Sequence, residues 1–234
     1  MALPQLNTAT YELKLPSTGE TIKYRPFLVK EQKILMLAQE SEDNKQIENA
    51  FAEIISSCTF KKFSPYEMPL FDIEYIFLKV RGKSVGDKIT LNVLCPDDEE
   101  TRVDVDINLE DVGVITNDDH TNEIELTKDI KIIMKYPTLS DMAGFSGKGE
   151  VLSIFEMIKN CIQEIHSGKE IYNSVDISSK ELDEFIGNMS TQNFEELGKF
   201  FETMPKLQHV IKVKNPKTKK TGEITIVGMQ SFFV

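Results

Sequence analysis

Apolar and polar residues alternate in two short segments near the N-terminus, residues 11–15 and residues 20–24. A period of two is typical of β-strands, and the intervening residues 16–19, Pro-Ser-Thr-Gly, are turn formers. The pattern therefore predicts a β-hairpin. Pro26 ends the second strand, and good helix formers follow from Val29, which predicts a corner from strand to helix. The polar residues expected to be exposed in this segment, without a special role, are Glu20, Lys23 and Arg25.

After this corner the apolar period changes to three and four, which is typical of helices. Residues 30–40 predict a short helix, and the next helix has a continuous apolar stripe. A third helix is expected to stop at Gly82, since glycine is a common residue at the C-terminal end of a helix. The stripe residues are Ile47, Ala50, Phe51, Ile54, Ile55 and Cys58, and then Ile73, Ile76, Phe77 and Val80. Residues 1–82 are thus expected to form a hairpin followed by three helices.

Between residues 83 and 136 the period returns to two, which predicts a β-rich region with one face in a core. The alternating apolar residues are Ile89, Leu91, Val93, Val103, Val105, Ile107, Leu109, Ile124, Leu126, Ile130, Ile132 and Met134.

Residues 137–234 predict a helical region that is closed by a C-terminal hairpin. The expected elements are a short helix opened by a capping box at 138–141, a glycine-rich break at 144–149, a helix over 151–165, a helix capped by Ser178 and Glu181, a helix over 194–204, and strands at 210–214 and 223–227. Strands and helices are segregated along the chain, so the predicted class is α+β, in which antiparallel hairpins combine with helical bundles.

Two of the predicted hairpins resemble each other. Cys95-Pro96 ends one strand and Asn215-Pro216 ends another, and each pair is followed by a charged turn and a returning strand. This is the pattern of a zinc-ribbon knuckle whose cysteine pairs are missing, because the first hairpin keeps one Cys and the second has none. A structural zinc needs four Cys or His ligands, and only one of the four positions here, Cys95, carries such a residue. We therefore expect two zinc-ribbon-like hairpins that lack metal ligands and are held by ordinary packing.

The formal net charge of −11 is concentrated in one segment. Thirteen acidic residues lie between residues 97 and 129, against only Arg102 and Lys128. A smaller basic group of six lysines lies between Lys206 and Lys220. An acidic chain repels phosphate, so nucleic acid is disfavoured as a partner. Both groups are interpreted as solvated strand edges and turns, or alternatively as surfaces with charge complementary to a partner protein.

We find no catalytic or cofactor-binding motif. His120, His166 and His209 are isolated from one another and from cysteine. Residues 144–149, GFSGKG, lack the Ser or Thr and the earlier glycine of a phosphate loop, and they are not a nucleophile elbow. The acidic run at 97–100 lacks the ligand spacing of a calcium loop. The expectation is a protein that is not an enzyme, with no cofactor, no metal and no catalytic residues.

The three cysteines are widely spaced, and Cys58 and Cys161 fall on apolar helix faces, so Cys58, Cys95 and Cys161 are interpreted as buried structural thiols. No stretch approaches the roughly 18 to 20 apolar residues of a membrane span. The N-terminus has neither the basic segment nor the apolar segment of a signal peptide. We therefore expect a reducing cytoplasm and no membrane partner.

Four segments carry a family resemblance: LPSTGE at 15–20, KYRPFLVKE at 23–31, FFETMPKL at 200–207 and GMQSFF at 228–233. Together they resemble the baseplate hub assembly protein family of T-even-type contractile-tailed bacteriophages. Members of that family often carry cysteine pairs in the two knuckle-like hairpins. This chain departs from that pattern, because Asp98, Asn215 and Thr218 stand where thiols are expected.

The resemblance implies a late viral protein without enzymatic activity, which helps to build the central hub of the tail baseplate in the host cytoplasm as an assembly factor or chaperone that binds hub proteins. Three alternatives stay open. The first is a permanent structural subunit of the virion baseplate, and the second is a hydrolase that uses the acidic segment. The third is a self-assembling oligomer, in which the tail Phe232-Phe233-Val234 docks into a neighbour instead of finishing its own core. The partner-binding surface is not identified by the sequence.

Overall fold

The computed structural model describes residues 7–41, 43–142 and 150–232. The chain forms two compact units: Met1–Ile115 together with Lys206–Val234 make unit 1, and Thr116–Pro205 make unit 2. Both units combine helices with antiparallel sheets, so the predicted α+β class is confirmed. Within the described residues, no helix has both the length and the apolar character needed to cross a membrane.

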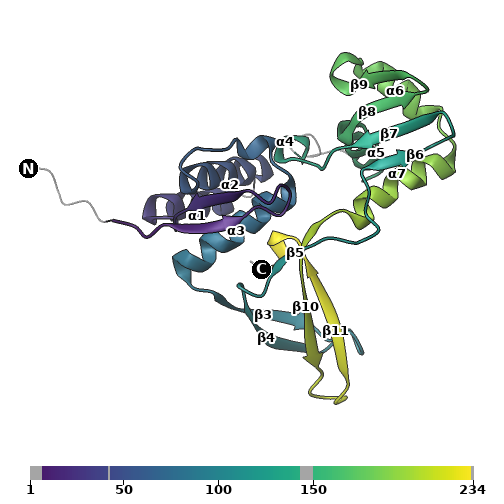
Figure 1. Ribbon diagram of the computed structural model, residues 1–234. Helices are drawn as coiled ribbons and strands as arrows, with labels where there is room; N and C mark the ends of the chain where they lie inside the picture. The colour runs from purple at the N-terminus through teal and green to yellow at the C-terminus, as the bar shows by residue number, and fades with distance from the viewer. Residues whose placement is uncertain (1–6, 42, 143–149, 233–234) are drawn as a thin grey trace, which may run out of the picture. The chain divides into compact units, whose positions relative to one another are not determined.

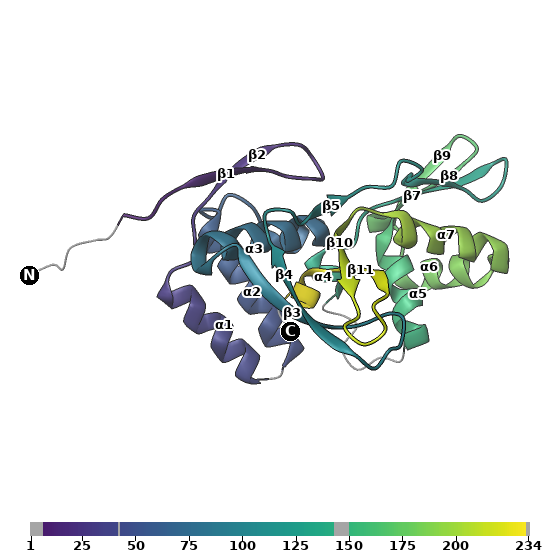
Figure 2. The same cartoon turned by 90° about the horizontal axis from the view of Figure 1, so that it is seen from below.

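Unit 1 begins with the predicted hairpin. Strands β1 (Tyr11–Lys14) and β2 (Thr21–Tyr24) pair antiparallel, with Tyr11 opposite Tyr24. Leu13 and Ile22, at opposite positions of the ladder, are both buried. The hairpin lies across the helices that follow it (Figures 1 and 2) and shares one hydrophobic core with them.

Three helices follow, as predicted: α1 (Val29–Ser41), α2 (Asn44–Cys58) and α3 (Leu70–Val85), with a 3₁₀ turn at Pro65–Glu67. The predicted end of α3 at Gly82 is wrong. Gly82 lies inside the helix, where an added Cβ atom would come within 2.4 Å of Asp87 Oδ1, so that the Asp87 side chain would have to shift. The helix ends at Gly86, whose φ of 112° is unfavourable for residues with a side chain.

Two small sheets complete unit 1. Strands β3 (Lys88–Leu94) and β4 (Arg102–Asn108) form a hairpin. Strand β10 (Lys206–Lys214) lies between β11 (Thr221–Val227) and β5 (Gly113–Ile115) in an antiparallel sheet. A last 3₁₀ turn, Met229–Phe232, returns to the helices.

Unit 2 is an antiparallel sheet with helices on one face (Figure 2). The strand order is β6 (Glu123–Glu125), β7 (Ile130–Met134), β8 (Ile162–Ser167) and β9 (Glu170–Asn173). The helices are α4 (Leu139–Met142), α5 (Glu150–Cys161), α6 (Ser179–Gly187) and α7 (Thr191–Thr203), with a 3₁₀ turn at Ser174–Asp176. The predicted capping boxes are present at Thr138 with Asp141, and at Ser178 with Glu181.

The predicted helix over 151–165 is too long. Helix α5 ends at Cys161, and Ile162 begins β8. Ile162 and Ile165 are both buried although three residues apart, because a register shift in the pairing with β7 places Ile162 opposite Met134. An irregular strand of this kind presents an apolar spacing that resembles a helix. The glycine-rich break predicted at 144–149 lies outside the described residues.

The two units differ from the three regions expected at 1–82, 83–136 and 137–234. Residues 83–115 belong to unit 1, because β3, β4 and β5 contribute to the same core as the N-terminal helices. The C-terminal hairpin belongs there too, since Lys206 on β10 lies opposite Ile115 on β5. Unit 2 is thus an insertion that leaves unit 1 after β5 and returns to it at the adjacent strand.

Candidate functional site

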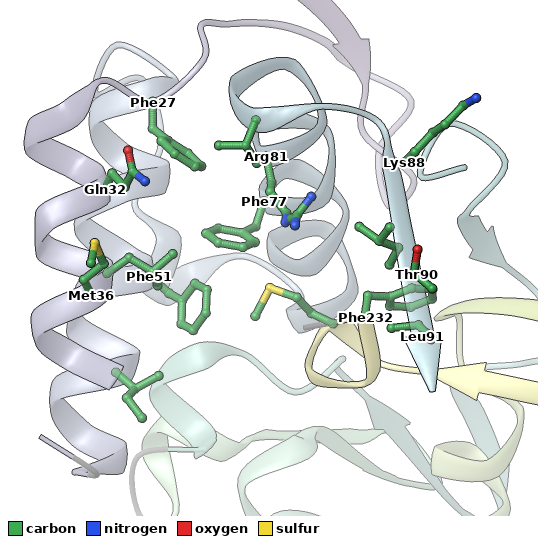
Figure 3. Close-up of a pocket in the computed structure, with 15 residues that line it drawn as sticks. Phe27, Gln32, Met36, Phe51, Phe77, Arg81, Lys88, Thr90, Leu91 and Phe232 are labelled. Carbon is green, nitrogen blue, oxygen red and sulfur yellow. The ribbon is translucent and has the colours of Figure 1, made fainter. Parts of the chain in front are cut away.

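An apolar groove of about 660 Å³ opens in unit 1 (Figure 3). Its walls come from α1, α2, α3, β3 and the C-terminal 3₁₀ turn. The lining residues are Phe27, Gln32, Leu35, Met36, Ile47, Phe51, Phe77, Arg81, Val85, Lys88, Ile89, Thr90, Leu91, Met229 and Phe232. Its volume lies within the roughly 300 to 1,000 Å³ of typical ligand pockets.

Aromatic side chains form the floor of this groove. Phe51 and Phe77 meet edge to face, with ring centroids 4.6 Å apart, and both point into the cavity (Figure 3). Phe232 closes the opposite side and is 1% exposed. The turn that carries Phe232 is fixed by a hydrogen bond from the Met229 N–H to Glu74 Oε1 at 3.1 Å. The turn Met229–Phe232 therefore builds part of the groove wall, and Phe232 packs into the core of its own unit.

The rim of the groove exposes apolar surface. Met36 on α1 and Val85 on α3 are 55% and 54% exposed. The guanidinium of Arg81 lies between Phe77 and Thr90, whereas the side chain of Lys88 points away (Figure 3). Burial lowers the pKa of Arg81. Among the described residues, the lining contains no carboxylate, histidine or cysteine, and it combines apolar side chains with the cations of Arg81 and Lys88.

A second feature of unit 1 is a turn geometry that occurs three times, at residues 15–19, 95–99 and 215–219. In each turn the first residue is buried, precedes a proline, and accepts a hydrogen bond from the N–H of the fifth residue, at 2.8, 3.0 and 2.9 Å. The fifth residue has a positive φ of 72°, 53° and 66°. The side chain of the fourth residue accepts from the N–H of the sixth. Sequence reasoning found the second and third turns as knuckles and missed that the first turn shares their geometry.

The second and third turns are joined by polar side chains, which we call the clasp. The buried amide of Asn215 donates to Asp97 Oδ1 at 2.9 Å and to Asp98 Oδ2 at 2.8 Å. The Thr218 hydroxyl donates to Asp97 Oδ2. Hydrogen bonds hold the pKa of Asp97 below its usual value, and the bond from Thr218 has a larger effect than the bond from Asn215. The pKa of Asp98 is lowered further, chiefly by the N–H and hydroxyl of Thr101.

The clasp occupies the positions at which a zinc knuckle has its ligands, and it does not fit zinc. Cys95 supplies one thiol, and burial, followed by the nearby charge of Asp98, raises its pKa. The carboxylate oxygens already accept hydrogen bonds from Asn215, Thr218 and Thr101. In the described ranges no group of three or more His, Cys, Asp or Glu side chains has the geometry to hold a metal ion. A tetrahedral site with four strong ligands is therefore not available here.

The corner after β2 contains a buried ion pair. Arg25 Nη2 lies 2.8 Å from Glu31 Oε1, and the two side chains are 13% and 2% exposed. Ser57 donates to the same oxygen, and the Leu28 N–H donates to the other. The predicted exposed position of Arg25 is therefore wrong: this side chain joins the end of β2 to the start of α1 and the end of α2.

The acidic residues between 97 and 129 are divided between the two units, and several of them pair individually with neighbours. Asp104 accepts from Asn92, and Asp106 accepts from Thr90, across the β3–β4 ladder. Glu110 pairs with Lys83, and Glu123 pairs with Lys131, each at 2.7 Å. Among the residues described, these carboxylates are dispersed and do not converge on one another as a pair of acid and base.

The histidines and the remaining cysteines have separate surroundings. His120 Nδ1 lies 2.9 Å from Thr203 Oγ1, and His166 Nε2 lies 2.6 Å from Glu164 Oε2. Cys58 and Cys161 are fully buried, and burial raises the pKa of their thiols to about 11 and about 12. Thiols with such high pKa values are poor nucleophiles near neutral pH.

Comparison with known proteins gives one family. A family model described as T4 bacteriophage base plate protein matches residues 8–234, which is nearly the whole chain. Searches of curated proteins and of solved structures gave no match. The match spans both units, including the knuckle-like hairpins and the C-terminal turn that walls the groove. The chain therefore belongs to the T4 bacteriophage base plate protein family.

Proposed function

We propose that this protein acts in assembly of the central hub of the phage tail baseplate, as a non-enzymatic assembly factor that binds hub proteins in the host cytoplasm. The observation that carries the proposal is the apolar groove of unit 1, in a chain whose family builds the baseplate. Its exposed apolar rim, which includes Met36 and Val85, suits contact with a protein segment. The similarity of residues 15–31 and of the C-terminal segments to hub assembly proteins supports the choice of the hub.

Co-expression tests the binding step. Tagged full-length protein, produced together with each baseplate protein of the same phage in turn, is expected to retain at least one hub protein through affinity capture and size-exclusion chromatography. A hub complex that forms in high salt as well as low salt would agree with an apolar contact. Failure to retain any hub protein in any pairing would contradict the proposal.

A permanent structural subunit of the baseplate is the second candidate, and membership of a base plate protein family favours it directly. Quantitative mass spectrometry of purified virions separates the two roles. An assembly factor is expected in infected-cell lysate and missing from the virion, whereas a subunit is present in a fixed ratio to the other baseplate proteins. A hydrolase that uses the acidic segment is not favoured, because its carboxylates lie apart in both units.

A further inference from the structure

Unit 2 has a pocket of its own, about 420 Å³ in volume, where the sheet meets α6 and the turn after β9. We call this cavity the unit 2 pocket. Its volume lies within the range of typical ligand pockets. The lining residues are Ile130, Ile165, Ser167, Tyr172, Asp176, Ile177, Glu181, Leu182 and Phe185.

The unit 2 pocket is an open end of the core of this unit. Ile165 belongs to that core and is 7% exposed. Tyr172 is opposite Ile165 in the β8–β9 ladder, so both side chains lie on the face of the sheet that the helices cover. Tyr172 is nevertheless 45% exposed, and Ile130, Ile177 and Phe185 are half-buried. The apolar side chains of this pocket are therefore accessible to another protein.

The charges in the pocket are negative. Among the described residues, the charged side chains of its lining are Asp176 and Glu181, and no Lys, Arg or His lines it. Hydrogen bonds from Ser178 lower the pKa of Glu181, so this carboxylate is ionised near neutral pH. The exposed side chain of Asp176 has no hydrogen bond or ion pair within the part of the chain that the structure describes. A cation of a partner therefore meets no competitor at Asp176.

The whole unit has the same sign of charge. Residues 116–205 contain seventeen acidic residues against eight lysines and no arginine, and so carry most of the net charge of −11. A field of this sign attracts basic segments and repels acidic ones. It also disfavours a second copy of this chain as the occupant, because two such units repel each other.

We propose that the unit 2 pocket binds a segment of another baseplate protein in which a large apolar side chain stands close to a Lys or Arg. The inference rests on the proposed function and adds a second contact surface to it. The apolar side chain enters between Tyr172, Ile177 and Phe185, and the cation pairs with Asp176. Val175, which is 89% exposed beside Asp176, adds apolar surface next to the pocket. An anchor side chain in a pocket supplies affinity, and a charge pair at its rim supplies specificity.

Matched variants of the full chain test the pocket, with the hub protein retained in co-expression as the probe. Tyr172→Ser removes part of the wall, and Ile171→Ser is its control, because Ile171 is adjacent, 59% exposed and on the opposite face of the sheet. Asp176→Lys reverses the rim charge, and Asp118→Lys changes the charge of the unit equally at an exposed position outside the lining. We expect Tyr172→Ser and Asp176→Lys to weaken binding on the order of tenfold, with both controls near wild type.

NMR of isoleucine methyl groups locates the contact. The signals of Ile130 and Ile177, which line the pocket, are expected to shift when the hub protein is added, whereas the signal of Ile171 is expected to stay. Overlapping peptides of the hub protein identify the segment. The peptide that binds is expected to contain a large apolar residue near a Lys or Arg. Replacement of that cation by Glu is expected to weaken binding to the wild type and to restore binding to Asp176→Lys.

Each outcome decides the inference. Equal binding by all four variants, or unchanged Ile130 and Ile177 signals in the complex, would overturn it while the proposed function stands. A dimer of the free protein that Tyr172→Ser disrupts, measured by analytical ultracentrifugation, would assign the pocket to a second copy and would also overturn it. Thermal unfolding of each free variant shows whether a loss of binding is a loss of fold, and the charge exchange at Asp176 keeps the test decisive if Tyr172→Ser does not fold. If the wild type retains no hub protein, the proposed function and this inference both fail.

Discussion

Replacement of the buried carboxylate in the corner, Glu31→Gln, tests how the N-terminal hairpin is attached to the helices. Burial alone would raise the pKa of Glu31, but hydrogen bonds from Arg25, the Leu28 N–H and Ser57 outweigh it and lower the pKa from 4.5 to about 2. A difference of this size between folded and unfolded states stabilises the folded state by about 3 kcal/mol at pH 7. Because the folded pKa is the lower one, this stabilisation is present above about pH 4.5 and is lost as the pH falls toward 2.

Urea denaturation followed by circular dichroism measures the effect, since the chain has no tryptophan. The variant is expected to lose about 3 kcal/mol of unfolding free energy at pH 7, and about 1 kcal/mol at pH 3, where Glu31 is protonated in the unfolded chain and still mostly ionised in the folded one. Glu12→Gln is the matched control, because Glu12 and Lys23 form a pair at 3.8 Å with both side chains more than 60% exposed. Such a surface pair contributes about 1 kcal/mol or less.

Two results would refute this reasoning. A loss at pH 7 no larger than that of Glu12→Gln would show that the ion pair adds nothing beyond packing. A loss of the same size at pH 7 and pH 3 would show that the cost comes from the shape of glutamine and not from the missing charge.

Three other expectations follow from unit 1. Asn215→Ala is expected to lower the unfolding free energy by about 1 to 2 kcal/mol, because it removes a buried donor that joins two turns. Addition of a chelator to the wild type is expected to leave its melting temperature unchanged. A drop in the melting temperature would indicate a bound metal. Ser17→Ala is expected to cost about 1 to 3 kcal/mol in the same assay, because Asp72, which is fully buried, loses the hydroxyl that faces it; no loss would mean that the Ser17 N–H alone satisfies Asp72. Replacing residues 116–205 by a short Gly-Ser linker is expected to leave unit 1 folded, because Ile115 and Lys206 are directly opposite in the sheet. An unfolded or aggregated product in circular dichroism and light scattering would contradict the two-unit division.

The local parts of the fold were predictable from the sequence. The N-terminal hairpin, the three helices and the capped helices of unit 2 follow from short-range periodicity and end residues. The end of α3 was not predictable, because the closeness of Asp87 to Gly82 depends on a turn that the sequence pattern does not specify. The start of β8 was misread because a register shift gives buried isoleucines a helical spacing.

The groove and the clasp were beyond sequence reasoning for a different reason. Asn215 and Asp98 are 117 positions apart, and their hydrogen bond depends on the packing of two hairpins. The groove likewise joins α1 near residue 36 to the turn at Met229–Phe232. The resemblance of the knuckles was a sufficient signal that the two hairpins belong together, but the polar side chains at the ligand positions gave no sign that they would bond with each other.

The position of unit 2 between β5 and β10 has a consequence for synthesis on the ribosome. Domains commonly fold in the order in which they emerge, from the N-terminus onward. Here the core of unit 1 needs Leu207, Ile211, Val213, Ile226 and Phe232, which are made after unit 2. Unit 2 is complete before them and has a separate core. Helices α1 to α3 therefore stay without part of their core until β10 and β11 have been made, and a nascent chain released before then would lack the turn that walls its groove.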